Sequence, residues 1–368
     1  MKKFLASLCT ATMVMAAAPA VANDHNDRDG DDRNEATRSA VFIASNGAAG
    51  NNVLIYRRNA NGSLNAAGQV ATGGLGSGGG LGNQGGVTAT ESGQTLLVVN
   101  AGSNDLSVFR ARNGGLTLTD RLPSGGTRPV SVAVHDDIVY VLNAGSDNIS
   151  GFRLKSGRLA PIAGSTRPLS GSGTAPAQIA FSPSGDTLLV TEKATNKIVA
   201  YAVNDHGIAS GPIVQNSNGQ TPFGFAFDKR GHAIVSEAFG GSASALSSYN
   251  VSRTGTLRSI SNSIDATGQR AACWVVVSRN GRFAYTTNTA SGTISSFAIN
   301  RDGSLRLISS VAATTSAGPI DMDLSGNGET LFVLNAGAQT LQSFDVDQAT
   351  GSLTALETVS GEIGRAHV

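Results

Sequence analysis

Two glutamates, each placed where a run of β-forming residues ends, are the side chains of this chain best suited to acid–base chemistry. Glu192 closes the run "TLLVTE", Glu237 closes "HAIVSE", and Lys193 follows Glu192 directly. A carboxylate can act as a general base, and a nearby ammonium can stabilise an oxyanion. These residue types would suit hydrolysis of a lactone, with Glu192 or Glu237 as base and Lys193 or Arg128 stabilising the oxyanion. An ion pair that fixes a loop is the alternative for the same residues.

Asparagine occupies the corresponding position where the other apolar runs end. The members of this row are Asn46, Asn100, Asn143, Asn288 and Asn335. Asparagine before a small-residue turn bonds its own backbone, so turn formation is one explanation of the row. Ligand binding is the other, and for it we select Asn100, Asn143 and Asn288, together with Arg128, which precedes a further strand.

An acidic pair stands out in the segment "PIDMDLSG", where Asp321 and Asp323 are two residues apart. Other repeats carry small residues at these places. Two carboxylates inside a protein must be paired, hydrated or bound to a metal. We predict that both are largely buried. Pairing with Arg270 or with main-chain donors is one interpretation, and contact of Asp321 with a substrate is the other.

No cofactor or metal site is predicted. The stretch Gly73–Gly86 contains glycines in a dinucleotide-like spacing, but no helix or phosphate-binding lysine follows it. It is interpreted as a long connection. The acidic segment Asn23–Arg38 lacks the ligand spacing of a calcium loop. Cys273 has no histidine or other base nearby in the sequence, which favours a packing role.

All these candidates lie within a unit that the chain repeats seven times. Each unit of about 43 to 54 residues holds four short runs with the period-two or continuously apolar pattern of strands. The third run of each unit carries an aromatic in register: Tyr56, Phe109, Phe152, Tyr201, Tyr249, Phe297 and Phe344. No helical period is present after the first apolar run.

A four-stranded repeat of this length is typical of a β-propeller blade. We therefore predict an all-β, seven-bladed propeller of four-stranded blades, forming a single domain over residues 39–361. Strands are named a to d from the axis outward. In such blades the b-to-c loops and the d-to-a connections share one face, so the candidate residues should meet at the mouth of the ring.

The N-terminal residues predict export. Lys2 and Lys3 precede an apolar run that ends in small residues, which is typical of a signal peptide over residues 1–22. Residues 23–38 are predicted to be a disordered acidic leader. The expected location is the periplasm or the medium. Cys273 would then be the remaining cysteine, so the exported chain would form no internal disulfide.

The two ends of the repeat predict an incomplete ring. The first blade begins on a b strand, Val41–Asn46, with no inner strand before it, and residues 362–368 ("EIGRAHV") resemble a translated sequencing adapter. We predict a ring whose closing C-terminal inner strand is missing, with an unpaired position on the axis side of Val41–Asn46. Residues 362–368 are predicted to be a non-native tail that packs poorly.

The runs "VAVHDDIVYVLNAGSDNISGFRL" and "IAFSPSGDTLLVTEKATNKIVAYAV" resemble those of the seven-bladed lactonase-like propellers. That family includes bacterial 6-phosphogluconolactonases and fungal carboxymuconate-cyclising enzymes, and the resemblance covers nearly all of Val41–Ser360. It implies opening or closing of a lactone ring without a metal, by His, Arg and Glu side chains at the mouth. Ala177 and Gln178 stand where that family tends to carry histidine.

Two functions from different classes follow. The first is an exported lactonase that acts on an unphosphorylated lactone, because a phosphorylated sugar lactone is not expected outside the cytoplasm. The second is a secreted propeller that binds a small ligand or a protein partner without chemistry. The formal charge of +1 indicates no nucleic-acid partner. We further expect a monomer with no membrane anchor.

Overall fold

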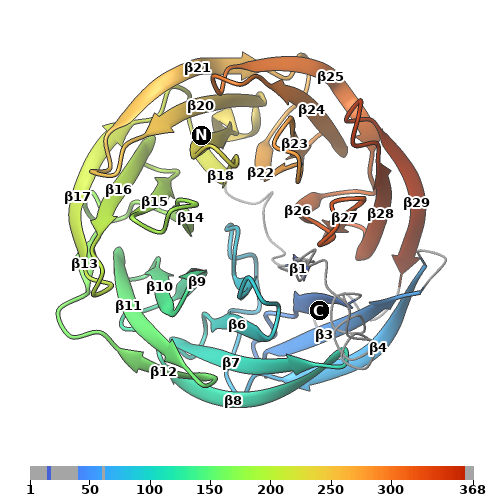
Figure 1. Ribbon diagram of the computed structural model, residues 1–368. Coiled ribbons are helices and arrows are strands. Elements are labelled where there is room, and N and C mark those ends of the chain that lie inside the picture. Colours follow the sequence, from blue (N-terminus) through green and yellow to red (C-terminus); the bar gives the residue numbers. More distant parts are fainter. Residues whose placement is uncertain (1–14, 18–39, 60–62, 361–368) are drawn as a thin grey trace, which may run out of the picture.

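The computed structural model describes residues 15–17, 40–59 and 63–360, with the side chains described only in the last two ranges. Seven antiparallel sheets stand around a common axis, as Figure 1 shows. The predicted seven-bladed all-β fold is confirmed. Within the described residues the helical structure is a single 3-10 turn, η1 (Phe239–Gly241).

The strands of each blade run outward from the axis in chain order. Blade 1 contains β1 (Met15–Ala17), β2 (Ala40–Ala44), β3 (Asn52–Arg58) and β4 (Leu64–Ala71). Blade 2 contains β5 (Val87–Ala89), β6 (Thr95–Asn100), β7 (Asp105–Arg112) and β8 (Gly115–Pro123). Blade 3 contains β9 (Pro129–His135), β10 (Ile138–Asn143), β11 (Asn148–Lys155), β12 (Arg158–Pro161) and β13 (Arg167–Pro168).

The remaining four blades have four strands each. Blade 4 contains β14 (Pro176–Phe181), β15 (Thr187–Glu192), β16 (Lys197–Val203) and β17 (Ala209–Asn216). Blade 5 contains β18 (Pro222–Phe227), β19 (His232–Glu237), β20 (Ala245–Val251) and β21 (Leu257–Asp265). Blade 6 contains β22 (Ala272–Val277), β23 (Phe283–Asn288), β24 (Thr293–Ile299) and β25 (Leu305–Thr314). Blade 7 contains β26 (Pro319–Leu324), β27 (Thr330–Asn335), β28 (Thr340–Val346) and β29 (Leu353–Ser360).

The outer edge of blade 3 differs from the predicted four-strand pattern. Two short strands, β12 and β13, pair with successive parts of β11 in place of one long strand. Both end in proline, Pro161 and Pro168, which has no N–H to donate to a ladder. The outer strand is therefore divided at this blade.

The seven aromatics of the third strands are all buried, with at most 3% of each exposed. They fill the space between blades, where neighbouring sheets diverge from the axis. One apolar cluster extends over five blades, because it joins Ile43, Ala177, Phe223, Trp274 and Phe344. This row of aromatics therefore packs the seams between blades.

The axis side of blade 1 corrects one prediction. The position beside β2 is occupied, because Met15–Ala17 pairs antiparallel with Val41–Ile43. Every residue of β2 is buried, so a bare inner edge would leave main-chain groups without partners inside the ring. The prediction of an unpaired position is therefore wrong for the chain that retains residues 15–17. Removal of the predicted signal peptide, residues 1–22, would vacate this position. Residues 361–368, predicted to pack poorly, lie outside the described residues.

The glycine-rich connection between β4 and β5 turns back towards the axis, as Figure 1 shows inside the ring beside β6. It makes close backbone contacts that leave no room for a side chain. A Cβ on Gly76 would overlap the backbone of Asn46, and one on Gly102 would overlap the carbonyl of Gly76. Nothing lies within 4 Å of the corresponding point at Gly79. Close packing therefore requires glycine at positions 76 and 102 but not at position 79.

We expect Gly76→Ala to destabilise the protein by about 1–3 kcal/mol, the usual cost of adding a carbon to a packed site. Gly79→Ala is the matched control and should not lower stability, because its Cβ would project into open space. Urea unfolding of both variants measures the difference. Equal stability of the two would contradict the close approach of the connection to blade 1.

Candidate functional site

The mouth of the ring is built from a repeated main-chain contact. The residue before each inner strand of blades 3 to 7 has a left-handed backbone, with φ between 49° and 67°. These residues are Arg128, Ala175, Thr221, Ala271 and Gly318, and the carbonyl of each accepts an N–H from the b-to-c loop of its own blade. Four of the five are not glycine, so the blades hold them in a conformation that costs free energy. The contact makes a rigid rim, which the sequence analysis did not foresee.

Glu192 is fully buried below this rim. Its Oε1 accepts the N–H of Ser170 at 2.9 Å. Its Oε2 accepts the hydroxyl of Ser170 and, at 2.6 Å, that of Thr195. Ser170 belongs to the connection that enters blade 4. The carboxylate therefore ties this connection to the end of β15.

Glu237 is also fully buried and does the same for blade 5. Its Oε1 accepts the N–H of Gly219 at 2.7 Å and the hydroxyl of Ser247 at 2.6 Å. Ser263 donates a further hydrogen bond to its Oε2. Both glutamates thus accept main-chain and hydroxyl donors. The structure places each in its own blade, and their predicted role as general bases stays a prediction.

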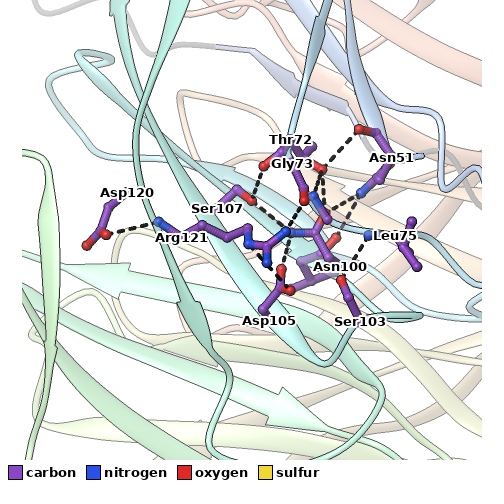
Figure 2. Close-up of polar contacts among 12 residues, drawn as sticks. Asn51, Thr72, Gly73, Leu75, Asn100, Ser103, Asp105, Ser107, Asp120 and Arg121 are labelled. Carbon is purple, nitrogen blue, oxygen red and sulfur yellow. Dashed lines mark hydrogen bonds and ion pairs between the residues drawn. The ribbon is translucent and has the colours of Figure 1, made fainter.

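Asn100 holds the equivalent place in blade 2 and makes the network of hydrogen bonds shown in Figure 2. Its Nδ2 donates to Asp105 at 2.6 Å and to Ser107 at 2.8 Å. Its Oδ1 accepts from Asn51 and from Thr72, both at 2.8 Å. The side chain is fully buried and joins blade 1, its connection and blade 2.

The other asparagines of the row are buried in the same way. Asn143 donates to the carbonyl of Ser124 at 3.3 Å, and Asn288 donates to Thr293 at 3.0 Å and Ser295 at 2.8 Å. The Oδ1 atoms of Asn143 and Asn288 accept no hydrogen bond from the described residues. Asn100, Asn143 and Asn288 are all fully buried, and their contact with substrate stays a prediction.

Lys193 is the candidate cation that lies nearest the axis. Its Nζ donates to the carbonyl of Gly82 and lies 4.6 Å from the centre of the Phe223 ring, a cation–π geometry. Lys193 is half-buried, whereas Arg128 is exposed on the rim. The structure therefore separates the two predicted cations and brings neither onto a glutamate among the hydrogen bonds and ion pairs described above.

The position of Lys193 follows from that of the segment Leu81–Gly86, which crosses the central channel just below the mouth. Asn83 donates to the carbonyl of Val130, and Gln84 donates to the carbonyls of Ala177 and Val275 at 3.0 and 3.1 Å. These acceptors belong to blades 3, 4 and 6. The indole of Trp274 donates to the carbonyl of Asn83 at 2.9 Å. We call Leu81–Gly86 the plug.

The acidic pair lies on β26, an inner strand. Asp321 is 2% exposed, which confirms its predicted burial, whereas Asp323 is only half-buried. The main-chain N–H of Met322 donates to Asp321 at 2.8 Å, and that of Leu324 donates to Asp323 at 2.8 Å. Main-chain donors are thus part of the pairing, as one of the two interpretations stated. Contact of Asp321 with a substrate stays a prediction.

Metal ligation has no cluster to support it in the part of the chain that the structure describes. No group of three or more His, Cys, Asp or Glu side chains there is arranged to hold an ion. A cavity of about 400 Å³ opens between the loops of blades 6 and 7 on the mouth face, lined by Thr289, Ser291 and small residues. None of the predicted site residues lines it.

These features define the class of protein. It is a seven-bladed propeller whose rim is rigid, whose connections are held by buried polar side chains and whose channel is filled by the plug. A family model described as "Lactonase, 7-bladed beta-propeller" matches residues 48–167, 163–271 and 246–364. The chain therefore belongs to the lactonase family of seven-bladed β-propellers, which confirms the resemblance inferred from its strands.

Individual relatives are more distant. A 6-phosphogluconolactonase of Yersinia pseudotuberculosis is 28% identical over 120 residues, which are 31% of this chain and 35% of that protein. The structure of a periplasmic gluconolactonase of Pseudomonas aeruginosa aligns with a TM-score of 0.69 and 18% identity, covering 88% of this chain and 96% of that one. A Lactobacillus plantarum protein aligns with a TM-score of 0.69 and 20% identity, covering 84% and 92%. At these identities the two structures show the fold alone.

We expect Glu237→Ala to destabilise the protein by about 2–4 kcal/mol, because the buried N–H of Gly219 and two serine hydroxyls lose their acceptor. Glu237→Gln keeps one acceptor oxygen, and the hydroxyls can reorient, so its loss should be much smaller. Urea unfolding compares the two variants. If alanine leaves stability unchanged, the carboxylate is not a structural tie.

Because Tyr201 is buried near Glu192, we expect the protein to lose stability in alkaline solution. Burial, with the charge of Glu192 as the lesser cause, raises the pKa of Tyr201 far above its usual 10.0. Because the pKa of Tyr201 is higher in the folded chain than in the unfolded chain, this tyrosine contributes stability that is complete below pH 10. The contribution is lost as the pH rises above 10, since the unfolded chain alone then releases the proton.

Unfolding by urea at pH 8, 10 and 11 measures this effect. One tyrosine steepens the fall by up to about 1.4 kcal/mol per pH unit. Tyr201→Phe should lose the hydrogen bond to the carbonyl of Pro168 at every pH but decline less steeply above pH 10. Parallel declines of the two proteins would exclude Tyr201 as the source.

Proposed function

We propose that this protein is an exported lactonase that opens an unphosphorylated lactone at the mouth of the ring. The observation that carries the proposal is a half-buried cation, Lys193, at the mouth of a lactonase-family propeller. Export is supported by the signal-peptide pattern of residues 1–22 and is compatible with the periplasmic gluconolactonase of similar fold. None of the helices in the described part of the chain is long and apolar enough to cross a membrane.

Lactone opening needs stabilisation of negative charge on the carbonyl oxygen. Water attacks the carbonyl carbon, the ring C–O bond breaks, and the proton of the water passes to the leaving alkoxide, which gives a hydroxy acid. The ammonium of Lys193 is suited to the developing oxyanion, and Arg128 on the rim is suited to the departing end of the ligand. Glu192, which precedes Lys193 in the chain, would accept the proton only after Ser170 or Thr195 released its carboxylate.

A second function is favoured by the burial of both glutamates. Because each carboxylate already accepts hydrogen bonds from its own connection, the mouth would bind a small ligand without a base in contact with it. The protein would then be a secreted binding propeller at the same site. The two functions differ in turnover and share the ligand site.

A panel of lactones, assayed by release of acid, tests the proposal. We expect glucono-δ-lactone to be opened faster than its 6-phosphorylated form. Lys193→Gln should lower kcat/KM by about 100-fold, the usual effect of removing an oxyanion donor. Lys229→Gln, an exposed lysine on the opposite face, is the matched control.

The possible outcomes separate the two functions. Acid release that Lys193→Gln leaves unchanged would remove Lys193 from the mechanism. Stabilisation by a lactone without any acid release would favour the binding propeller. N-terminal sequencing of the protein from the cell envelope tests export, and a chain that still begins at Met1 would contradict it.

A further inference from the structure

The ammonium of Lys193 is bound by an oxygen that the protein itself supplies. Gly82 offers its main-chain carbonyl, a neutral acceptor of the same kind as the oxygen of a ligand. The Phe223 ring covers the ammonium from a second side at 4.6 Å. The plug therefore occupies the place next to Lys193 that an acceptor oxygen of a ligand would take.

The two ends of the plug are held differently. Asn83, Gln84 and Gly85 bond the inner strands of blades 3, 4 and 6. On the other side of Gly82 the chain is glycine-rich and is held by blade 1, because Asn46 donates to the carbonyl of Gly79 at 2.6 Å. Gly82 has a φ of 61°, in the left-handed region that glycine adopts freely. The Gly82 carbonyl can thus turn away while the downstream residues stay in place.

We propose that Lys193 is a carboxylate-binding site that Gly82 masks, and that its ligand is a small hydroxy acid. The hydrogen bond from an ammonium to a carboxylate is charge-assisted on both sides and roughly twice as strong as one between neutral groups. A carboxylate therefore displaces the Gly82 carbonyl, whereas a neutral lactone or amide competes with it on nearly equal terms. The choice of a hydroxy acid rests on the proposed function, since this is the product of lactone opening.

The protein carries its own reporter of this exchange. Trp274 is the single tryptophan of the chain. Its indole N–H bonds the carbonyl of Asn83 at 2.9 Å, and its ring lies 5.1 Å from that of Phe223, centre to centre. Movement of the plug or loss of the Lys193–Phe223 contact changes the surroundings of this indole, and hence its fluorescence.

Titration of the full chain with gluconate, followed by tryptophan fluorescence at constant ionic strength, tests the proposal. We expect a saturable change with gluconate and at least about 10-fold weaker binding of gluconamide, its neutral counterpart. Lys193→Gln should abolish the response, and Lys193→Arg should keep it, because a cation is retained. Lys229→Gln should respond like the unaltered protein.

Asn83→Ala separates masking from simple damage. This variant removes the bond to the carbonyl of Val130 but keeps the Asn83 carbonyl that Trp274 contacts. A loosened plug leaves Lys193 unmasked more often, so the apparent affinity for gluconate should rise. Weaker binding by Asn83→Ala, an equal response to gluconate and gluconamide, or an unchanged response of Lys193→Gln would each overturn the proposal.

The titration needs no turnover, so its result is independent of the lactone assay. Gluconate binding through Lys193 without acid release would support the masked site and contradict the lactonase. Acid release without gluconate binding would support the lactonase and contradict the masked site. Thermal unfolding of each variant confirms that it is folded before either assay is read.

Discussion

Each blade is a sheet with two apolar faces, and only a neighbouring blade on either side can cover both. This requirement shapes the whole ring. One apolar cluster joins residues of blades 4, 5, 6, 7 and 1, and another joins residues of blades 2, 3 and 4. Because β2 is buried along its whole length, its axis edge needs a paired strand. In the full chain Met15–Ala17, which is part of the predicted signal peptide, takes that position. The inner strands then approach one another closely around the channel that the plug fills.

The connections between blades are the second consequence of the ring, because each must pass from the outer edge of one blade to the axis side of the next. A polar side chain at the end of the second strand holds each connection that we described. Asn100 accepts from Thr72, whereas Glu192 and Glu237 accept main-chain N–H groups of their connections. A carboxylate can accept two or more donors and an amide oxygen is weaker, so glutamate suits connections that present both N–H and hydroxyl groups.

The sequence predicted the ring well and the site only in outline. Aromatics such as Phe109 and Phe297 were readable because burial between blades imposes a fixed spacing along the chain. The burial of Glu192 and Glu237 was not readable, because their donors Ser170 and Ser263 lie 22 and 26 residues away. The bare inner edge of blade 1 was predicted wrongly, since pattern matching cannot show which distant segment fills a vacant strand position.

The Gly73–Gly86 stretch links the packing of the ring to its mouth. Its glycines are needed where the backbone lies against Asn46 and Asn100, and the same absence of side chains lets the chain enter the channel as a narrow strand of peptide. Once there, it presents carbonyl groups in place of side chains, and Lys193 and Trp274 bond two of them. The plug therefore both supports the inner strands and competes for the cation at the mouth. A ligand that binds Lys193 must work against this contact, so the stability of the plug sets the affinity of the site.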